Sequence, residues 1–303
     1  MLPDLPGSRV RVRVCGVTDP GMKREENQDS FLIADLSDPE QDLRLPSPAE
    51  QTRQRVRDME VGSRGALFMV ADGMGGAAGG RVASRMATSH VLTSIVSRWT
   101  LERGPSPSRF IASIEEAVQA SNALIHDQSN RHPAYHGMGT TATVAGVFED
   151  YLYLAQIGDS RAYLVRGGRC TQLTRDQSFE NFAVQRGLMS PEEVEKSAHR
   201  NVILQALGPN SSVEADLTYQ HLRLDDVLVL CSDGLFRVVQ EPEIAAATAM
   251  DVAEGCDALV AMAKERGAPD NVTVLLARFG GDGLRPPTAS DPVGRQPLPE
   301  RGG

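Results

Sequence analysis

The sequence has few cysteines, and none of them lies close to another. The four are Cys15, Cys170, Cys231 and Cys256, and no C-x-x-C pair occurs among them. Zinc sites and redox-active dithiols usually have such short spacings, so the pattern disfavours both. Isolated cysteines are instead typical of buried thiols in a reducing compartment. We therefore expect a cytoplasmic protein.

The sequence also lacks long apolar runs and basic blocks. No segment approaches the roughly 18 consecutive apolar residues that a membrane-spanning helix needs. Met1 is followed by Leu-Pro-Asp-Leu-Pro-Gly, which does not resemble a secretion signal. The net charge is −9, from 40 acidic and 31 basic residues. We therefore expect neither a membrane nor a nucleic-acid partner, and the excess of acidic residues favours cations.

The length and the hydrophobic content allow a large core. The chain has 303 residues, of which 41% are hydrophobic. We expect a flexible N-terminus over residues 1–8, one folded region over residues 9–280 and a disordered tail over residues 281–303, which is rich in proline, glycine and charge. Residues 36–64 show no sustained periodicity and are predicted to form an exposed insertion, with a helical stretch near residues 49–59.

The hydrophobic periodicity predicts helices packed on antiparallel strands. Charged and aliphatic residues alternate over residues 9–14, as in a half-buried strand, and apolar residues recur at helical spacing over residues 80–99 and 109–128. Further strands are expected at residues 139–148, 151–157, 162–165, 227–231 and 272–277. Because strands follow strands directly, the sheet should be largely antiparallel. A polar segment from residue 174 has a capping box at Ser190 and predicts a small helical flap.

A glycine-rich turn follows one short apolar run. Residues 66–70 suit a buried strand, which delivers Asp72 into a turn containing five glycines: Gly73, Gly75, Gly76, Gly79 and Gly80. Such a backbone can approach a ligand closely and take positive φ, so that a carbonyl and a carboxylate face one small charged object. A glycine-rich turn between a strand and a helix could equally indicate nucleotide binding. The chain lacks the alternating β-α units and the phosphate-loop lysine that this alternative requires.

Five aspartates lie within a residue or two of a predicted strand end. They are Asp29, Asp72, Asp159, Asp233 and Asp270. Each alone is most simply a turn residue. If the strand ends converge, however, the carboxylates would repel one another and require cations. Oxygen ligands without a nearby cysteine or histidine pair favour Mg²⁺ or Mn²⁺.

Two such ions could activate a water for attack at phosphorus. A phosphate substrate also favours a nearby arginine, because a guanidinium binds phosphate through two parallel hydrogen bonds. Arg24, five residues before Asp29, is the candidate. These residues indicate a phosphate-directed hydrolase.

Six motifs carry a resemblance to a known family. They are Arg24-x-x-Asn27-Gln28-Asp29, Ala71-Asp72-Gly73-Met74-Gly75-Gly76, Gly139-Thr140-Thr141, Gly158-Asp159-Ser160-Arg161, Ser232-Asp233-Gly234-Leu235 and Asp270-Asn271. In this order they resemble the bacterial form of the metal-dependent serine/threonine protein phosphatases of type 2C, the PPM class. The resemblance covers about residues 10–279. It implies an α+β fold, a four-layer α-β-β-α sandwich with two central antiparallel sheets.

The resemblance also implies roles for individual residues. Asp72 would bridge two core Mn²⁺ or Mg²⁺ ions, Gly73 would offer its carbonyl to one of them, and Asp233 and Asp270 would complete the other. Asp29 would act mainly through a water on the metal. Two further roles follow: Asp159 with Asp233 would form a third ion site, and Arg24 would bind the substrate phosphate. Residues 174–208 resemble the family's mobile flap, where substrates would be selected.

Two positions depart from the family pattern. Gln28 stands where a glutamate is usual, which removes one charge and is expected to weaken metal binding more than activity. Met74 stands where some members have a histidine suggested as the general acid. The proton donor is therefore open among a metal-bound water and four histidines: His126, His132, His136 and His199.

Two functions from different classes are compatible with this sequence. The main prediction is a monomeric protein phosphatase that acts on phosphoserine or phosphothreonine in phosphorylated proteins and opposes a serine/threonine kinase. A regulator of sigma-factor switching would be a phosphatase as well. The alternative is a pseudophosphatase that binds a phosphoprotein or kinase without turnover. Retention of Arg24, Asp72, Asp233 and Asp270 favours the enzyme, and only Gln28 favours the alternative.

Overall fold

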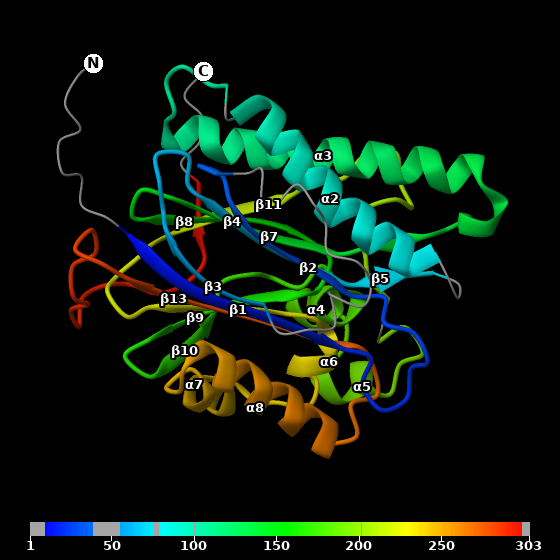
Figure 1. Ribbon diagram of the computed structural model, residues 1–303. Coiled ribbons are helices and arrows are strands. Elements are labelled where there is room, and N and C mark those ends of the chain that lie inside the picture. The colour runs from blue at the N-terminus through cyan, green and yellow to red at the C-terminus, as the bar shows by residue number, and fades with distance from the viewer. Residues whose placement is uncertain (1–9, 39–54, 76–78, 100, 201, 299–303) are drawn as a thin grey trace.

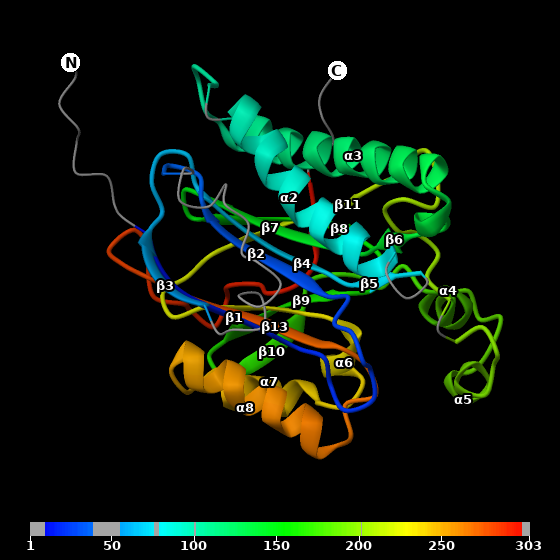
Figure 2. The same cartoon turned by 45° about the vertical axis from the view of Figure 1, so that its right-hand side comes forward.

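Two antiparallel sheets stack face to face, and helices cover both outer faces. The computed structural model describes residues 10–38, 55–75, 79–99, 101–200 and 202–298. Each large sheet has six strands, and a two-stranded sheet lies beside them. Figures 1 and 2 show the four layers, with α2 and α3 on one side and α7 and α8 on the other. The predicted α-β-β-α sandwich is confirmed.

Sheet A has the strand order β10-β9-β12-β13-β1-β3. Its strands are β10 (Arg169–Gln172), β9 (Arg161–Arg166), β12 (Val227–Cys231), β13 (Val272–Gly280), β1 (Arg11–Asp19) and β3 (Arg55–Glu60). Every neighbouring pair is antiparallel. The first and last long strands of the chain, β1 and β13, therefore lie side by side within this sheet.

Sheet B has the strand order β14-β11-β8-β7-β4-β2. Its strands are β14 (Gln296–Pro297), β11 (Asp216–His221), β8 (Tyr151–Ile157), β7 (Ala142–Phe148), β4 (Ala66–Ala71) and β2 (Ser30–Asp35). The predicted hairpin is β7–β8, with Phe148 opposite Tyr151. The short strands β5 (Gly73–Met74) and β6 (Gly139–Thr140) pair next to the glycine-rich turn.

The helices form three groups. Helices α2 (Gly79–Trp99) and α3 (Pro107–Arg131) pack on sheet B, and α7 (Glu241–Ala247) and α8 (Val252–Glu265) pack on sheet A. Between them in the chain lie a 3-10 helix (Pro133–Tyr135), the flap helices α4 (Phe179–Gln185) and α5 (Pro191–Glu195), and the short α6 (Asp233–Phe236). The predicted capping box at Ser190 is present. None of the helices in the described ranges is long and apolar enough to cross a membrane.

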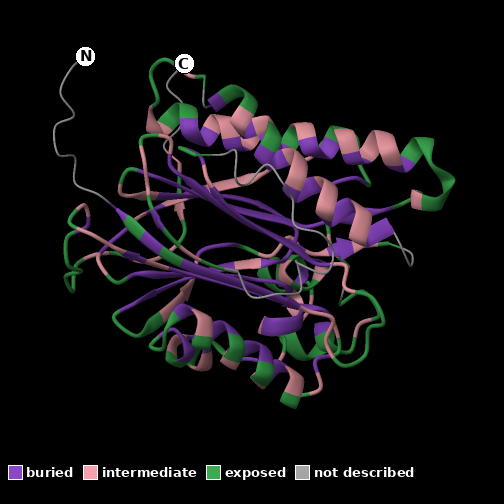
Figure 3. Cartoon of the chain, viewed as in Figure 1, coloured by how far each residue is buried: buried purple, intermediate pink, exposed green. Residues whose placement is uncertain are grey.

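Three apolar layers form the core. Between the sheets lie Ile33, Phe68, Leu230 and Leu275, all fully buried. A second layer joins sheet B to α2 and α3, and a third joins sheet A to α7 and α8. Figure 3 shows the strands buried almost throughout, whereas the helices alternate buried and exposed residues. These strands are buried on both faces, and this explains why their apolar residues form continuous runs and do not alternate with polar ones.

The prediction of a helical stretch near residues 49–59 is wrong for its described part. Residues 55–60 form the edge strand β3, which pairs antiparallel with β1. Met59 is buried, while Arg13 of β1 forms an ion pair with Asp58 of β3. An edge strand can be largely polar because only one of its sides pairs and few of its side chains enter the core. Residues 39–54 lie outside the described residues.

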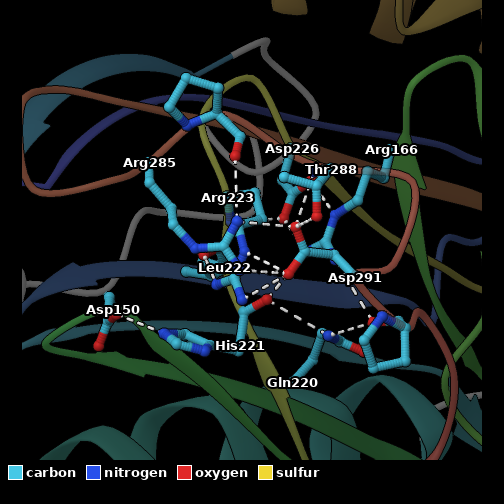
Figure 4. Close-up of polar contacts among 12 residues, drawn as sticks. Asp150, Arg166, Gln220, His221, Leu222, Arg223, Asp226, Arg285, Thr288 and Asp291 are labelled. Atoms are coloured by element: carbon cyan, nitrogen blue, oxygen red, sulfur yellow. Dashed lines mark hydrogen bonds and ion pairs between the residues drawn. The ribbon is translucent and has the colours of Figure 1, made fainter.

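The prediction of a disordered tail is also wrong for residues 281–298. Leu284 is buried in the layer between the sheets, and β14 adds to the edge of sheet B at β11. Asp291 accepts hydrogen bonds from Arg223 Nε and Nη2 at 3.0 and 2.8 Å, and it also pairs with Arg285 (Figure 4). One buried carboxylate thus anchors a segment with few apolar side chains. Residues 1–9 and 299–303 lie outside the described residues.

We predict that Asp291→Asn lowers the melting temperature by several degrees. The arginines hold the pKa of Asp291 well below its usual range, first Arg285 and then Arg223. A carboxylate with a depressed pKa adds stability that is complete above the unfolded-state pKa, about 3.9, and is lost as the pH falls below it. Thermal unfolding of wild type and Asp291→Asn from pH 7 to pH 3 measures the melting temperatures and their dependence on pH.

The difference in melting temperature between wild type and Asp291→Asn should therefore become smaller as the pH falls. Glu116→Gln is a matched control, because it removes a carboxylate from an exposed pair with Arg98. Such exposed pairs contribute roughly 0 to 1 kcal/mol. Equal melting temperatures for wild type and Asp291→Asn at pH 7 would contradict the anchoring role.

Candidate metal centre

The five predicted aspartates meet at one end of the sandwich. Sheet register brings the ends together: Ser30 of β2 lies opposite Ala71 of β4, and Asp19 of β1 lies opposite Val272 of β13. Asp29, Asp72 and Asp270 flank these ends. Burial, followed by the charges of Asp29, Asp233, Asp159 and Asp270, raises the pKa of Asp72 well above its usual range. The convergence proposed from the sequence therefore holds in the fold.

Asp29 is held by two hydroxyl groups. Its Oδ2 accepts hydrogen bonds from Thr273 Oγ1 at 2.6 Å and from Ser232 Oγ at 2.7 Å. Its Oδ1 is buried and has no hydrogen-bond partner. Burial raises the pKa of Asp29 to about 7. One oxygen is thus fixed in place, while the other is free to face a cation.

The backbone of Asp72 is fixed by the motif Gly139-Thr140-Thr141. The Asp72 amide donates to Thr141 Oγ1 at 2.9 Å. Its carbonyl accepts from Thr140 Oγ1 and from the Thr141 amide, each at 2.9 Å. These bonds use only the main chain of Asp72. The motif therefore orients the aspartate without using its carboxylate.

The glycines of the turn serve close packing more than positive φ. A Cβ on Gly73 would lie 2.2 Å from the Gly80 carbonyl oxygen and 2.5 Å from that of Gln28. Neither Gly73 nor Gly80 has positive φ; among the described glycines of this turn only Gly75 does, at 101°. The start of α2, the turn and the loop before Asp29 can approach one another because these side chains are absent.

Asn271 fixes the loop that carries Arg24. Its Nδ2 donates to the carbonyls of Pro20 and Glu26 at 3.0 Å each, and its Oδ1 accepts from the Gln28 amide at 2.9 Å. The sequence analysis assigned no role to this amide. The sequence shows an Asp-Asn pair before a strand, but it does not show which groups the asparagine binds. Those groups lie more than 240 residues away in the chain.

Arg24 lies at the aspartate cluster, as predicted, and its guanidinium is hydrogen-bonded to one of the aspartates, Asp270. Its Nε donates to Asp270 Oδ1 at 2.9 Å and its Nη2 to Asp270 Oδ2 at 2.7 Å. The Arg24 side chain is 57% exposed. A guanidinium that is half in solvent and bound to a carboxylate at two points can exchange that carboxylate for a phosphate of similar geometry.

Asp159 and Asp233 lie together near α6. Burial raises the pKa of Asp159 to about 7, and the charge of Asp233 adds to this. Each has a buried Oδ1 without a hydrogen-bond partner. Arg237, which the sequence analysis did not single out, donates from Nε to Asp233 Oδ2 at 2.8 Å, and its Nη2 lies 3.9 Å from Asp159 Oδ2.

The donor set fits hard divalent cations. Within the described residues, no three histidine, cysteine, aspartate or glutamate side chains are placed so that they could together hold an ion as they stand. Arginines lie within ion-pair distance of three of the aspartates, Asp159, Asp233 and Asp270. The cluster nevertheless has three buried carboxylate oxygens without hydrogen-bond partners, on Asp29, Asp159 and Asp233. Buried, mutually repelling carboxylates with free oxygens are the ligands that Mg²⁺ and Mn²⁺ prefer.

Three of the four candidate histidines make side-chain contacts typical of structural residues. His126 Nδ1 lies 2.8 Å from the Gly208 carbonyl oxygen, His132 packs against Tyr135, and His199 packs against Phe179 of the flap. Met74 lies in β5 opposite Gly139. None of these contacts involves the aspartate cluster.

The flap is joined directly to the cluster. The Gln177 amide donates to the Gly158 carbonyl, next to Asp159, at 2.9 Å. Phe179 and Leu204 close the flap through main-chain hydrogen bonds to Val202 and Gln177. Figure 2 shows α4 and α5 projecting at the end of the sandwich where β5 and α6 lie. The flap therefore stands beside the aspartates.

The fold and the site together define a sandwich protein with a carboxylate centre for hard metal ions and an adjacent arginine. Comparison with known proteins identifies the family. The family model for Protein phosphatase 2C matches residues 53–275, so the chain belongs to the Protein phosphatase 2C family. This is a metal-dependent family, and the family resemblance of the sequence is confirmed.

Individual relatives and a solved structure agree with this family assignment. The chain is 38% identical over 212 residues to the serine/threonine protein phosphatase PstP of Mycobacterium tuberculosis, covering 70% of this chain and 40% of PstP. It is 34% identical to the protein phosphatase PhpP of Streptococcus pneumoniae, covering 69% and 84%. The chain therefore spans about two-fifths of the length of PstP. A crystal structure of the PstP catalytic domain with two manganese ions superimposes with a TM-score of 0.68 at 33% identity, covering 89% of this chain and 99% of that one.

Proposed function

We propose that the protein is a metal-dependent phosphatase that removes phosphate from phosphoserine and phosphothreonine in proteins. The observation that carries the proposal is the group of three buried carboxylate oxygens without partners, beside an exposed arginine. Membership of the Protein phosphatase 2C family supports the same reaction. Its substrates are then phosphorylated proteins, and its activity opposes a serine/threonine kinase.

In this proposal Asp72, Gly73, Asp233 and Asp270 hold two core ions, Mn²⁺ or Mg²⁺. When bound, two such ions lower the pKa of a water and offset the charge on the phosphate oxygens. Asp29, fixed by Ser232 and Thr273, presents its free Oδ1 to the same centre. The hydroxyl groups therefore act as positioning groups for Asp29, and Asn271 does the same for the loop carrying Arg24.

Arg24 binds the substrate phosphate and releases Asp270 in doing so. Both oxygens of Asp270 are occupied by the Arg24 guanidinium. A phosphate with two free oxygens offers the same bidentate geometry with more charge. The exchange would place Arg24 on the substrate and free both oxygens of Asp270, a residue that would hold a core ion.

We predict that Arg24→Ala raises KM by about tenfold or more and lowers kcat much less, because an interaction made equally with substrate and transition state affects KM. Steady-state hydrolysis of a phosphothreonine peptide at saturating Mn²⁺ measures both constants. Arg131→Ala is the control, since Arg131 lies on α3 in an exposed pair with Asp127. An unchanged KM would refute the assignment of Arg24 to phosphate.

The flap is the proposed surface for substrate selection. Five of its large hydrophobic side chains are exposed: Phe182, Val184, Leu188, Val202 and Leu204. Leu188 is 65% exposed. Apolar side chains gathered on one surface segment mark contact with another molecule. A phosphorylated segment bound at Arg24 would pass close to this surface.

The reaction is tested by hydrolysis of p-nitrophenyl phosphate and of a phosphothreonine peptide with Mn²⁺ or Mg²⁺. Turnover that depends on the metal supports the enzyme. Tight binding of the phosphopeptide without turnover at saturating Mn²⁺ would select the pseudophosphatase instead. We further propose a monomer in the cytoplasm, in line with the four free thiols. Sedimentation and fractionation measure these two properties.

A further inference from the structure

Arg237 lies where the family resemblance places a third metal ion. That site would use Asp159 and Asp233. The Arg237 guanidinium contacts both: Nε is 2.8 Å from Asp233 Oδ2, and Nη2 is 3.9 Å from Asp159 Oδ2. The first is a hydrogen-bonded ion pair, and the second is within the range of direct charge attraction. The position between the two carboxylates therefore already has a cation.

Local structure explains why the arginine is held there. Asp233 is the first residue of α6 and Arg237 caps its end, so the two are four residues apart and their side chains share one face. Phe236, between them, packs beneath the Arg161 guanidinium at 3.7 Å. Arg161 in turn binds Asp176 through both carboxylate oxygens. These contacts hold α6 in place, and with it the backbone of Arg237.

The start of α6 is fixed as well. A Cβ on Gly234 would lie 2.0 Å from the Asn271 carbonyl oxygen, so α6 packs directly on the backbone that leads into β13. Asp233 cannot move away from Asp72 and Asp270 without breaking this contact. Its carboxylate is therefore held between these aspartates and Arg237.

The two oxygens of Asp233 have different partners. Oδ2 accepts from Arg237, whereas Oδ1 is buried and has no hydrogen-bond partner. One oxygen thus remains for a core ion, while the other is taken. The Asp159 side chain is 6% exposed and has Arg237 as its nearby cation. A divalent ion placed between the same carboxylates would meet the guanidinium at close range, and like charges repel strongly in a partly buried site.

We propose that Arg237 replaces the third metal ion, so that this protein holds two ions and a guanidinium. The inference rests on the proposed function only for the two core ions. A guanidinium has one positive charge and carries no water that could be activated. It balances the charge of Asp159 and Asp233 at all metal concentrations, whereas a weakly bound third ion does so only when the metal is abundant.

The test is the number of Mn²⁺ ions bound by the 303-residue protein, measured by equilibrium dialysis and titration calorimetry up to millimolar Mn²⁺. Wild type and Arg237→Lys should bind two ions, since lysine keeps the charge. Arg237→Gln and Arg237→Ala should bind a third ion, with a dissociation constant at least about tenfold below the highest Mn²⁺ concentration at which wild type still holds two. The double variant Arg237→Gln with Asp159→Asn should lose it again. Arg98→Ala, which removes an exposed arginine on α2, should leave the number at two.

Three results would overturn the inference, and they can be told apart. A third ion in wild type that Asp159→Asn removes would show that the guanidinium does not exclude it. Two ions in both the glutamine and the alanine variant would show that Arg237 is not what keeps the third away. No bound Mn²⁺ in wild type would overturn the core metal centre, and the inference with it. Circular dichroism confirms that each variant is folded, and glutamine keeps much of the side-chain length if alanine unfolds α6.

Discussion

Asp72→Asn is expected to abolish metal-dependent phosphatase activity. The loss should be roughly a thousandfold or more, because an ion contributes several kcal/mol of charge stabilisation and each 1.4 kcal/mol is about a factor of ten in rate. The charges of four other aspartates all act on Asp72, which places it at the electrostatic centre of the cluster. Removing this carboxylate therefore removes the group that both core ions would share. Hydrolysis of p-nitrophenyl phosphate across a Mn²⁺ titration measures the effect.

The fold should survive this change. The hydrogen bonds that Thr140 and Thr141 share with Asp72 all use the Asp72 main chain, so asparagine can keep them. The neutral side chain also relieves repulsion among buried carboxylates, and the metal-free protein should be at least as stable as wild type. Mn²⁺ should then raise the melting temperature of wild type and have little effect on Asp72→Asn. Asp127→Asn, an exposed change on α3, should behave like wild type.

Removal of metal should have the same effect on wild type as the substitution. Excess chelator is expected to stop hydrolysis, and added Mn²⁺ should restore it. Persistent activity in excess chelator would exclude the metal mechanism. Full activity of Asp72→Asn would instead leave a metal mechanism possible but remove Asp72 from it.

Gly73→Ala is expected to damage the site nearly as much, by a different route. The added Cβ would meet the carbonyl oxygens of Gly80 and Gln28 at 2.2 and 2.5 Å, and both belong to the backbone. Flexible side chains can move aside, but here the start of α2 or the loop before Asp29 has to shift. Overpacking of this kind costs about 1–3 kcal/mol and occasionally more. We expect a lower melting temperature and activity reduced by at least about a hundredfold, because small displacements of catalytic groups cost this much.

The matched control is Gly104→Ala. A Cβ on Gly104 meets nothing within 4 Å, and its φ is not in the positive region. The same chemical change should therefore leave activity and melting temperature close to those of wild type. If Gly73→Ala also behaved like wild type, the close approach of the three backbone segments would not be needed for the site.

The comparison of these two glycines shows how far the sequence alone could go. The run of glycines after Ala71 correctly marked a special turn, and the expected reason was positive φ and a carbonyl exposed to a metal. The structure gives a different reason for Gly73 and Gly80, namely backbone segments in direct contact. Composition shows that small residues are required but does not identify what approaches them.

The two wrong predictions have related causes. Strand β3 and the segment 281–298 are both polar and lie at sheet edges or ends, where few side chains enter the core. Periodicity detects an element by its buried face, so an element with little buried surface gives a weak signal. The ordered tail depends instead on Asp291 and its partner Arg223, which is 68 residues away in the chain.

The sequence by itself determined most of the elements, their order, the family, and the places of the five aspartates and Arg24 at or near strand ends. These follow from local pattern and short motifs, because a strand, a turn or a helix cap is specified by residues close in the chain. Only the tertiary structure decided which atoms meet. Arg24 and Asp270 are 246 residues apart, and Asp29 and Ser232 are 203 apart. The stacking of the two sheets brings them together, leaves three carboxylate oxygens without partners, and sets Arg237 between Asp159 and Asp233. Side-chain pairing across such distances depends on register and packing, which no local pattern contains.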